Sequence, residues 1–386
     1  MVLTKKTLLN IIFVLWLVSE LFFQYTLISQ IALLIFCSAI IFFIPKIRFH
    51  VLSLSSFLFL CWSIINIVTG HTIDTSVSWA MTSTLMINFV FLLLFSQYYW
   101  YINDIKTILN LFSMVVIVFS LFCMIVGFGS VISLGRMHIN NINVNTAAYY
   151  AVYACLWSFY LIIFEKKLTC KNIFALLIYV TFVLMTGSRG AFFSLLLGMY
   201  LLFIVYNKKI MVAKIIFVTL IIISILMLVM NVDILYKVIG YRIEPLFDYF
   251  ITGSYEEASM YSRIQFSQLA YSKVKESLFW GHGLDCFRCL PSSYGMYSHN
   301  NYAEILFSLG ITGFVFYYFP YIWNLKYYLI SIFKKNNEAV VVGSFILIYL
   351  ISELFRTTYF NRCFLILPLI CYLYMSDEKR KARAFK

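Results

Sequence analysis

The feature that most constrains this chain is a series of twelve long apolar runs. They lie at about 8–23, 27–44, 50–69, 77–96, 110–128, 146–164, 172–187, 190–206, 211–231, 300–323, 338–353 and 360–375. A helix needs about 20 mostly apolar residues to cross a bilayer. Only 12% of the 386 residues are charged and 63% are hydrophobic, whereas a soluble domain is about a quarter charged. We therefore expect an all-α polytopic integral membrane protein with about 12 transmembrane helices.

The basic residues predict how such a protein is oriented. With the N-terminus in the cytoplasm, 19 of the 29 Lys and Arg residues fall in inside loops or at the two ends. They include Lys208, Lys209, Lys334 and Lys335 and, in the tail, Lys379, Arg380, Lys381, Arg383 and Lys386. This bias predicts that both termini are cytoplasmic. The net charge of +13 is then a topology signal and an anchor for anionic lipids, and no nucleic-acid partner is expected.

The start of the chain resembles a signal peptide, because Lys5 and Lys6 precede an apolar run. No small-residue cleavage site follows, so the first run is expected to be an uncleaved span.

One segment outside the predicted spans is long and divides the chain into three parts. Spans 1–9 occupy residues 1–231, the non-cytoplasmic loop occupies 232–299, and spans 10–12 with the basic tail occupy 300–386. Loops of this length are usually functional or disordered. Apolar residues at helical spacing, among them Ala270, Tyr271 and Leu278, predict a helix over 260–278. Arg263 falls within this apolar stripe, so we expect it to face protein, a lipid headgroup or a substrate.

Four basic side chains lie near predicted span ends on the outer side: Arg136, Arg189, Arg263 and His299. Arginine keeps its proton and offers a planar fork of donors that suits phosphate. Several arginines beside a membrane would suit a lipid-linked diphosphate. A histidine at the same place could take a proton from a hydroxyl group at neutral pH.

Each of these residues also has a structural interpretation. Arg189 could cap a tight turn between helices or reach lipid headgroups, and Arg136 could make an ordinary loop or headgroup contact. Arg263 could form an ion pair with Glu256 or Glu257.

The residues around His299 have structural interpretations as well. His299 could simply start a helix, and His282 is interpreted as part of a turn. Glu304 follows Asn300 by one helical turn, so the two share a face. Glu304 would then orient His299 or a substrate hydroxyl, or else satisfy a polar patch.

Several signatures of other chemistries are missing from the sequence. The outer loops hold no Asp-x-Asp pair, and the chain has no Walker A, dinucleotide-binding, His-Glu-x-x-His or Gly-x-Ser-x-Gly motif. Cys286 and Cys289 form a lone Cys-x-x-Cys, whereas a zinc site needs four ligands. We therefore expect no metal and no cofactor, and a disulfide between these two cysteines stays open.

Five motifs resemble those of one protein superfamily, and they occur in the same order. Thr186–Gly190 resembles the Ser-Arg-Gly signature of the O-antigen ligase and polymerase superfamily. The others are Gly135-Arg136 with Asn143-Val144-Asn145 (Arg…Asn-Pro-Asn, with Val144 in place of proline), Ser262-Arg263 at the start of the periplasmic helix, residues 279–287 (Gly-x-Gly-x-x-x-Phe), and residues 298–313 (His-Asn…Glu…Leu-Gly-x-x-Gly). The resemblance covers about residues 134–325 and leaves the first 130 residues similar in hydropathy alone.

The resemblance implies a GT-C-like, metal-independent glycosyltransferase of the bacterial cytoplasmic (inner) membrane, with its active site at the periplasmic face. Such an enzyme transfers a glycan from undecaprenyl diphosphate to an acceptor hydroxyl. By the resemblance, the catalytic residues are His299, which activates the hydroxyl, and Arg263 and Arg189, which offset the charge of the departing diphosphate. The substrate-binding residues are Arg136, Asn145, Asn300 and Glu304.

Within the superfamily, the His-Asn-Asn-Tyr block favours the Wzy-type O-antigen polymerase, which joins repeat units on the lipid carrier. The alternative is the ligase, which transfers the finished glycan to lipid A-core. A transporter or flippase of lipid-linked oligosaccharides is a third class, but such a protein would be expected to show internal symmetry and polar residues deep in several spans. The expected partners are the lipid-linked donor and acceptor and the bilayer, with a chain-length regulator as a further candidate.

Overall fold

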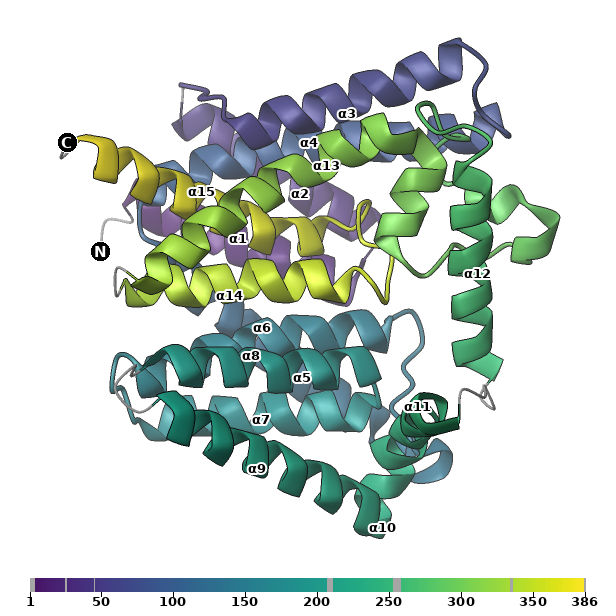
Figure 1. Cartoon of the computed structure of the whole chain (residues 1–386). Coiled ribbons are helices and arrows are strands. Elements are labelled where there is room, and N and C mark those ends of the chain that lie inside the picture. The colour runs from purple at the N-terminus through teal and green to yellow at the C-terminus, as the bar shows by residue number, and fades with distance from the viewer. Residues whose placement is uncertain are drawn as a thin grey trace. The chain divides into compact units, whose positions relative to one another are not determined.

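The computed structural model describes residues 4–24, 26–44, 46–206, 211–252, 258–333 and 336–384, and within these ranges the fold is helical (Figure 1). The helices are α1 (Lys5–Phe22), α2 (Leu27–Phe43), α3 (Val51–Val68), α4 (Thr75–Ile102), α5 (Ile105–Leu134), α6 (Val144–Ile163), α7 (Cys170–Thr186), α8 (Arg189–Tyr206), α9 (Met211–Asn231), α10 (Asp233–Leu235), η2 (Tyr236–Gly240), α11 (Tyr241–Thr252), α12 (Ala258–Val274), η3 (Cys286–Cys289), η4 (Pro291–Ser293), α13 (Asn301–Phe333), α14 (Asn337–Ser352) and α15 (Arg362–Ala384). These ranges contain no strand.

Each of the twelve predicted apolar runs overlaps a helix. In the described part of the chain, five helices are long and apolar enough to cross a membrane: α3, α4, α5, α6 and residues 301–330 of α13. The apolar helices α2, α7, α8 and α14 are shorter, and α9 meets η2 and α11 at a bend of 97°. The all-helical multi-pass architecture is confirmed, and the number twelve stays a prediction.

Some of the lysines on which the predicted orientation rests lie outside the described residues. They are Lys208, Lys209, Lys334, Lys335 and Lys386.

Local sequence explains where several helices begin and end. Asp74 caps α4 by accepting hydrogen bonds from the backbone N–H groups of Ser76 and Val77, and Asp104 caps α5 in the same way. The helices α5 and α7 end at Gly135 (φ 69°) and Gly187 (φ 62°), which take the left-handed conformation that glycine adopts without strain. Both glycines come directly before the predicted arginine motifs, so each motif starts at a helix end.

The described helices form two compact units. The first unit contains residues 1–36, 104–255 and 328–348, and the second contains 37–103, 256–327 and 349–386. In the first unit α6 packs against α5, α7 and α8, which run alongside it (Figure 1). Most of α6 is buried, from Ala147 to Leu161. In the second unit α4 packs against α3 and α15.

The helix α13 of the second unit is broken at Gly310, which has φ 63° and ψ −166°. Residues 278–283 fill the break. The backbone N–H groups of His282 and Gly283 donate to the carbonyls of Phe307 (2.9 Å) and Ser308 (2.8 Å). These contacts pair backbone groups that the break leaves without helical partners, as membrane-embedded backbone requires.

Two glycines make this close approach feasible. A Cβ atom on either Gly281 or Gly310 would lie 2.5 Å from backbone atoms of the other segment. The Gly-x-Gly and Leu-Gly-x-x-Gly motifs of the sequence are therefore the two halves of one backbone contact.

The helix α12 corresponds to the helix predicted over 260–278, but it ends four residues earlier. Its buried face is formed by Phe266, Ala270 and Val274, which follow one another at intervals of four residues. The predicted stripe is wrong at Tyr271 and Leu278, which are each 43% exposed. The buried face therefore differs from the predicted one by including Phe266, which packs in a hydrophobic cluster of the second unit.

Candidate functional site

Three arginines come together in the first unit, at the turn between α7 and α8. Arg189 donates from Nη1 to the carbonyl of Arg242 (2.8 Å), and Arg242 donates from Nη1 to the carbonyl of Gly187 (2.7 Å). A Cβ atom built on Gly187 would lie 3.4 Å from Cβ of Arg136. We call Arg136, Arg189 and Arg242 the arginine cluster.

The arginine cluster presents permanent positive charge at a helix end. Arg189 and Arg242 are half-buried and Arg136 is exposed. The acceptors of the two hydrogen bonds are carbonyl oxygens, which orient the two guanidinium groups. Arg242 was missed by the sequence analysis because it belongs to no motif and lies 53 residues after Arg189. The carbonyl of the turn residue Gly187 accepts from Arg242 and not from Arg189, so the interpretation of Arg189 as a turn cap stays a prediction.

The Asn-Val-Asn segment begins α6. Asn143 caps the helix by accepting a hydrogen bond from the backbone N–H of Thr146 (3.2 Å). Val144 is the first helical residue, a position where proline is also favoured, so the exchange of proline for valine keeps the helix start. Asn145 lies exposed on the first turn, and its role in substrate binding stays a prediction.

His299 lies in the second unit, just before α13, with a left-handed backbone (φ 57°). Its ring lies against Tyr297 (centroids 5.0 Å apart) and Phe266 (6.5 Å apart). A non-glycine residue at positive φ is unfavourable by roughly 1–3 kcal/mol and persists when its surroundings hold it, often at functional sites.

Three residues of the same turn hold this backbone. The fully buried Ser298 donates from its backbone N–H to Oε2 of Glu304 (2.8 Å) and from Oγ to the carbonyl of Asn300 (2.9 Å). Asn300 caps α13 through the N–H of Ala303 (3.2 Å) and hydrogen-bonds Tyr271. Both Glu304 and Asn300 are buried, and their contacts go to the protein. These contacts agree with an orienting role for Glu304, and substrate binding by either residue stays a prediction.

Asn301 ties the turn to the loop between α14 and α15. Its backbone N–H donates to the carbonyl of Glu353 (2.8 Å), and its Oδ1 accepts from the N–H groups of Thr358 (2.9 Å) and Tyr359 (3.2 Å). Its Nδ2 donates to the hydroxyl of Tyr318 (2.9 Å). This fully buried asparagine was not singled out in the sequence, where its only signal is its place after Asn300.

Arg263 reaches the same loop and acts on His299. Its Nη1 donates to the carbonyl of Phe355 (3.4 Å). Burial and, to a smaller extent, the charge of Arg263 lower the pKa of His299 to about 4. The imidazole is therefore neutral at neutral pH and has a lone pair that can accept a proton. Glu256 and Glu257, the alternative partners of Arg263, lie outside the described residues.

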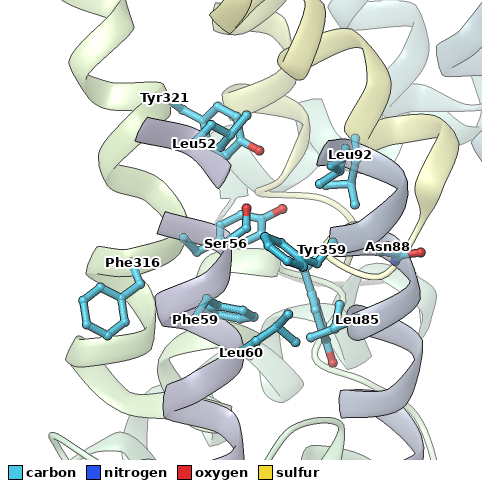
Figure 2. A pocket seen from close by; sticks show the side chains of 13 residues that line it. Leu52, Ser56, Phe59, Leu60, Leu85, Asn88, Leu92, Phe316, Tyr321 and Tyr359 are labelled. Carbon is cyan, nitrogen blue, oxygen red and sulfur yellow. The ribbon is translucent and has the colours of Figure 1, made fainter. Parts of the chain in front are cut away.

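A buried polar network continues from Asn301 into the second unit. Glu353 accepts hydrogen bonds from Thr358 and from Tyr317 (3.3 Å). Next to it, Tyr317 and Tyr359 help to line a cavity of about 40 Å³, whose walls come from α3, α4, α13, α15 and the loop before α15 (Figure 2). This volume is enough for ordered water and too small for a sugar, so the cavity is not a substrate site.

Two other sequence features belong to the packing of the second unit. The Nε2 atom of His282 lies 3.0 Å from the carbonyl of Lys273, and its ring packs on Phe307, which agrees with the turn interpretation. Cys286 and Cys289 are free thiols. Burial raises the pKa of both thiols, so they are protonated and unreactive at neutral pH.

The fold is that of a multi-pass membrane protein. Two groups of polar residues lie at the ends of its helices, namely the arginine cluster and the turn that holds His299. Residues 174–318 match the O-antigen ligase family, which confirms the resemblance to the O-antigen ligase and polymerase superfamily. The matched segment contains Arg189, Arg263 and His299 and leaves out Arg136 and Asn145. It supports a role in glycan transfer in the inner membrane, without separating a polymerase from a ligase. No curated protein matches the chain.

Proposed function

We propose that this protein polymerises O-antigen, or a related polysaccharide, by metal-independent glycosyl transfer. The donor is an undecaprenyl-diphosphate-linked oligosaccharide, and the acceptor is a sugar hydroxyl at the periplasmic face. The observation that carries this proposal is His299, a neutral imidazole held in a left-handed turn beside Arg263. The family match over the same segment supports it.

In the proposed reaction His299 takes the proton of the acceptor hydroxyl. The hydroxyl oxygen forms a bond to the anomeric carbon of the donor, and the bond from that carbon to the diphosphate oxygen breaks. The diphosphate leaves with the electron pair, so in-line attack inverts the anomeric centre. A neutral imidazole has its lone pair free at the working pH, and the negative charge of a bound diphosphate would raise its pKa toward the working pH, where a base is most effective.

The arginines are assigned to the diphosphate. In the first unit, the backbone contacts of Arg189 and Arg242 support this role because they fix two guanidinium groups before any substrate is bound. Preorganised donors stabilise developing charge at low reorganisation cost. Arg263 of the second unit is assigned to the same charge, and Arg136 and Asn145 to binding. We assign Ser298, Glu304 and Asn301 to positioning His299, which their contacts with the backbone favour.

A deletion strain tests polymerase against ligase. A Gram-negative strain that lacks a polymerase and keeps its ligase should transfer a single repeat unit to lipid A-core. We expect gels to show core plus one repeat, with the ladder restored by the intact gene and not by the His299→Ala form. Bare core with polymer on the lipid carrier would assign the protein to the ligases.

A reaction with purified protein separates glycan transfer from transport. The protein in detergent, with lipid-linked repeat units and no vesicles, should form new glycosidic bonds and release undecaprenyl diphosphate. A flippase would leave the substrate unchanged, since its activity needs two compartments. Unchanged substrate, with a folded protein, would contradict glycosyl transfer.

A further inference from the structure

A groove at the other end of the second unit is large enough to hold a lipid. It has a volume of about 1020 Å³ and is lined by the start of α3, the second half of α4, the second half of α13 and α15. Its wall on α13 includes Trp323, about 22 residues after the helix begins. Trp323 lies 13 residues beyond the break at Gly310, which is about 20 Å along the second half of α13, and no residue of the His299 turn lines the groove, so the groove is separate from the candidate site.

The lining of the groove changes from aromatic-polar to purely apolar. One part contains His50, Trp100, Tyr372 and Asp377, and another contains Phe57, Phe89, Leu93 and Phe319. Tryptophan and tyrosine gather where membrane proteins meet the headgroup layer, and phenylalanine and leucine lie at hydrocarbon depth. The groove therefore follows the polarity of a bilayer leaflet.

The exposed Arg48 lies beside the polar part, next to Trp100, although it is not itself one of the residues that line the groove. The guanidinium of Arg48 lies 5.9 Å from the ring centre of Trp100. Gln97 holds both backbone groups of Arg48, accepting from its N–H (2.8 Å) and donating to its carbonyl (2.9 Å). An arginine held in this way suits a phosphate group.

A buried amide belongs to the wall of the groove as well. Asn324 lines it and is 2% exposed, and among the residues that the structure describes its Nδ2 has no hydrogen-bond partner. An unsatisfied buried amide is unfavourable. The Nδ2 atom itself is covered by protein, so a rotation of the amide toward the groove is what would let an ester carbonyl of a lipid supply the missing acceptor.

We propose that this groove binds a glycerophospholipid of the surrounding bilayer. One acyl chain lies against Phe57, Phe89 and Phe319, an ester carbonyl accepts from Asn324, and the phosphate lies at Arg48. The three aromatic side chains exclude water, the amide fixes the glycerol, and the arginine selects lipids that carry a phosphate.

Native mass spectrometry of the full chain, released from mild detergent, tests this proposal without any activity assay. We expect one phospholipid per chain on the folded protein. Leu93→Trp fills the groove and should reduce this species about tenfold, which corresponds to about 1.4 kcal/mol. Asn324→Leu and Arg48→Gln should each reduce it by a smaller factor. The control Ile125→Trp changes an exposed residue of α5 and should leave it unchanged.

Three results would overturn the proposal. The first is equal phospholipid retention in Leu93→Trp and the parent chain. The second is retention of added diacylglycerol, which lacks phosphate, as strongly as phosphatidylglycerol. The third is a parent chain that carries a second copy of itself and no phospholipid, with this dimer lost in the Leu93→Trp protein. Because no result depends on glycan transfer, the proposal stands or falls separately from the proposed function.

Discussion

The arginine cluster of the first unit and the His299 turn of the second are held in different ways. Backbone carbonyls orient Arg189 and Arg242, whereas buried side chains, Glu304 and Asn301 among them, hold the backbone around His299. A binding cation needs only an orientation, because arginine is charged at any pH. A base needs a fixed ring and a set protonation state as well. We therefore expect His299 to depend on its surroundings more than the arginines do.

The largest expected effect comes from His299 itself. Its alanine and glutamine variants should insert into the membrane and lose about 10²–10⁴-fold in glycan transfer, the usual value of a positioned base. The rate of glycosidic bond formation by purified protein measures this loss. His282→Ala is the matched control, which loses a contact with the carbonyl of Lys273 and the packing of its ring on Phe307 and should be much milder. Equal damage from both variants would indicate that the segment misfolds.

The next largest effect is expected when the arginines are replaced by lysine, which lacks the planar fork of guanidinium donors. Arg189→Lys keeps the charge and loses the planar donors, so we expect transfer to fall about 10–100-fold, the value of one or two hydrogen bonds to a charged group. Arg263→Lys should behave alike, Arg242→Lys should be intermediate, and the exposed Arg136 should tolerate lysine best. Ladder length on gels, at matched protein levels, gives the order. A full ladder in both Arg189→Lys and Arg263→Lys would show that charge alone suffices.

A smaller effect should follow from loosening the His299 turn. Asn301→Ala leaves the N–H groups of Thr358 and Tyr359 without their acceptor, and we expect transfer to fall about tenfold as the ring loses its position. Asn301→Asp keeps both acceptors but places a charge beside Glu353. Transfer per folded molecule separates positioning from simple loss of stability.

The stability control for Asn301 is Leu60→Ala, a cavity on α3 that should reduce stability by about 2–5 kcal/mol and leave transfer per folded molecule unchanged. If both variants behave alike, Asn301 supports the fold without positioning His299.

The smallest effect is a change in titration without a change in fold. Carbethoxylation requires the neutral imidazole, so His299 should react at a constant rate down to pH 5 and slow near pH 4. In Arg263→Gln the midpoint should rise but stay below 6.5, because burial is the larger cause of the lowered pKa. Site-resolved mass spectrometry measures both, with the exposed His138 as the reference for reagent access. A midpoint at or above 6.5 in the parent chain would contradict the lowered pKa of the half-buried His299.

The same pKa implies a sign for stability. In the window from about pH 6.5 down to about pH 4, the unfolded chain binds a proton at His299 and the folded chain does not. The contribution of His299 to the free energy of unfolding is therefore present above pH 6.5 and declines as the pH falls toward 4.

Much of the fold follows from local sequence, and much of the site does not. The apolar runs predict the helices because their pattern is contained within each segment, and Arg189 and His299 stand in short motifs at helix ends. Asn301 with Thr358, and Arg189 with Arg242, lie 57 and 53 residues apart, and no periodicity connects them. The register of α12 was partly wrong for the same reason, since contacts of Phe266 with other elements decide which face is buried.

The break in α13 has a consequence for motion. Three backbone hydrogen bonds join residues 278–283 to this helix, including the one from the N–H of Ile311 to the carbonyl of Leu278 (2.9 Å). Gly281 and Gly310 leave no room for the two segments to slide past each other. Residues 278–283 are therefore a fixed base for this part of the second unit. Because α12 contacts the His299 turn through Phe266 and Tyr271, the helix and the turn are held on this base as one body.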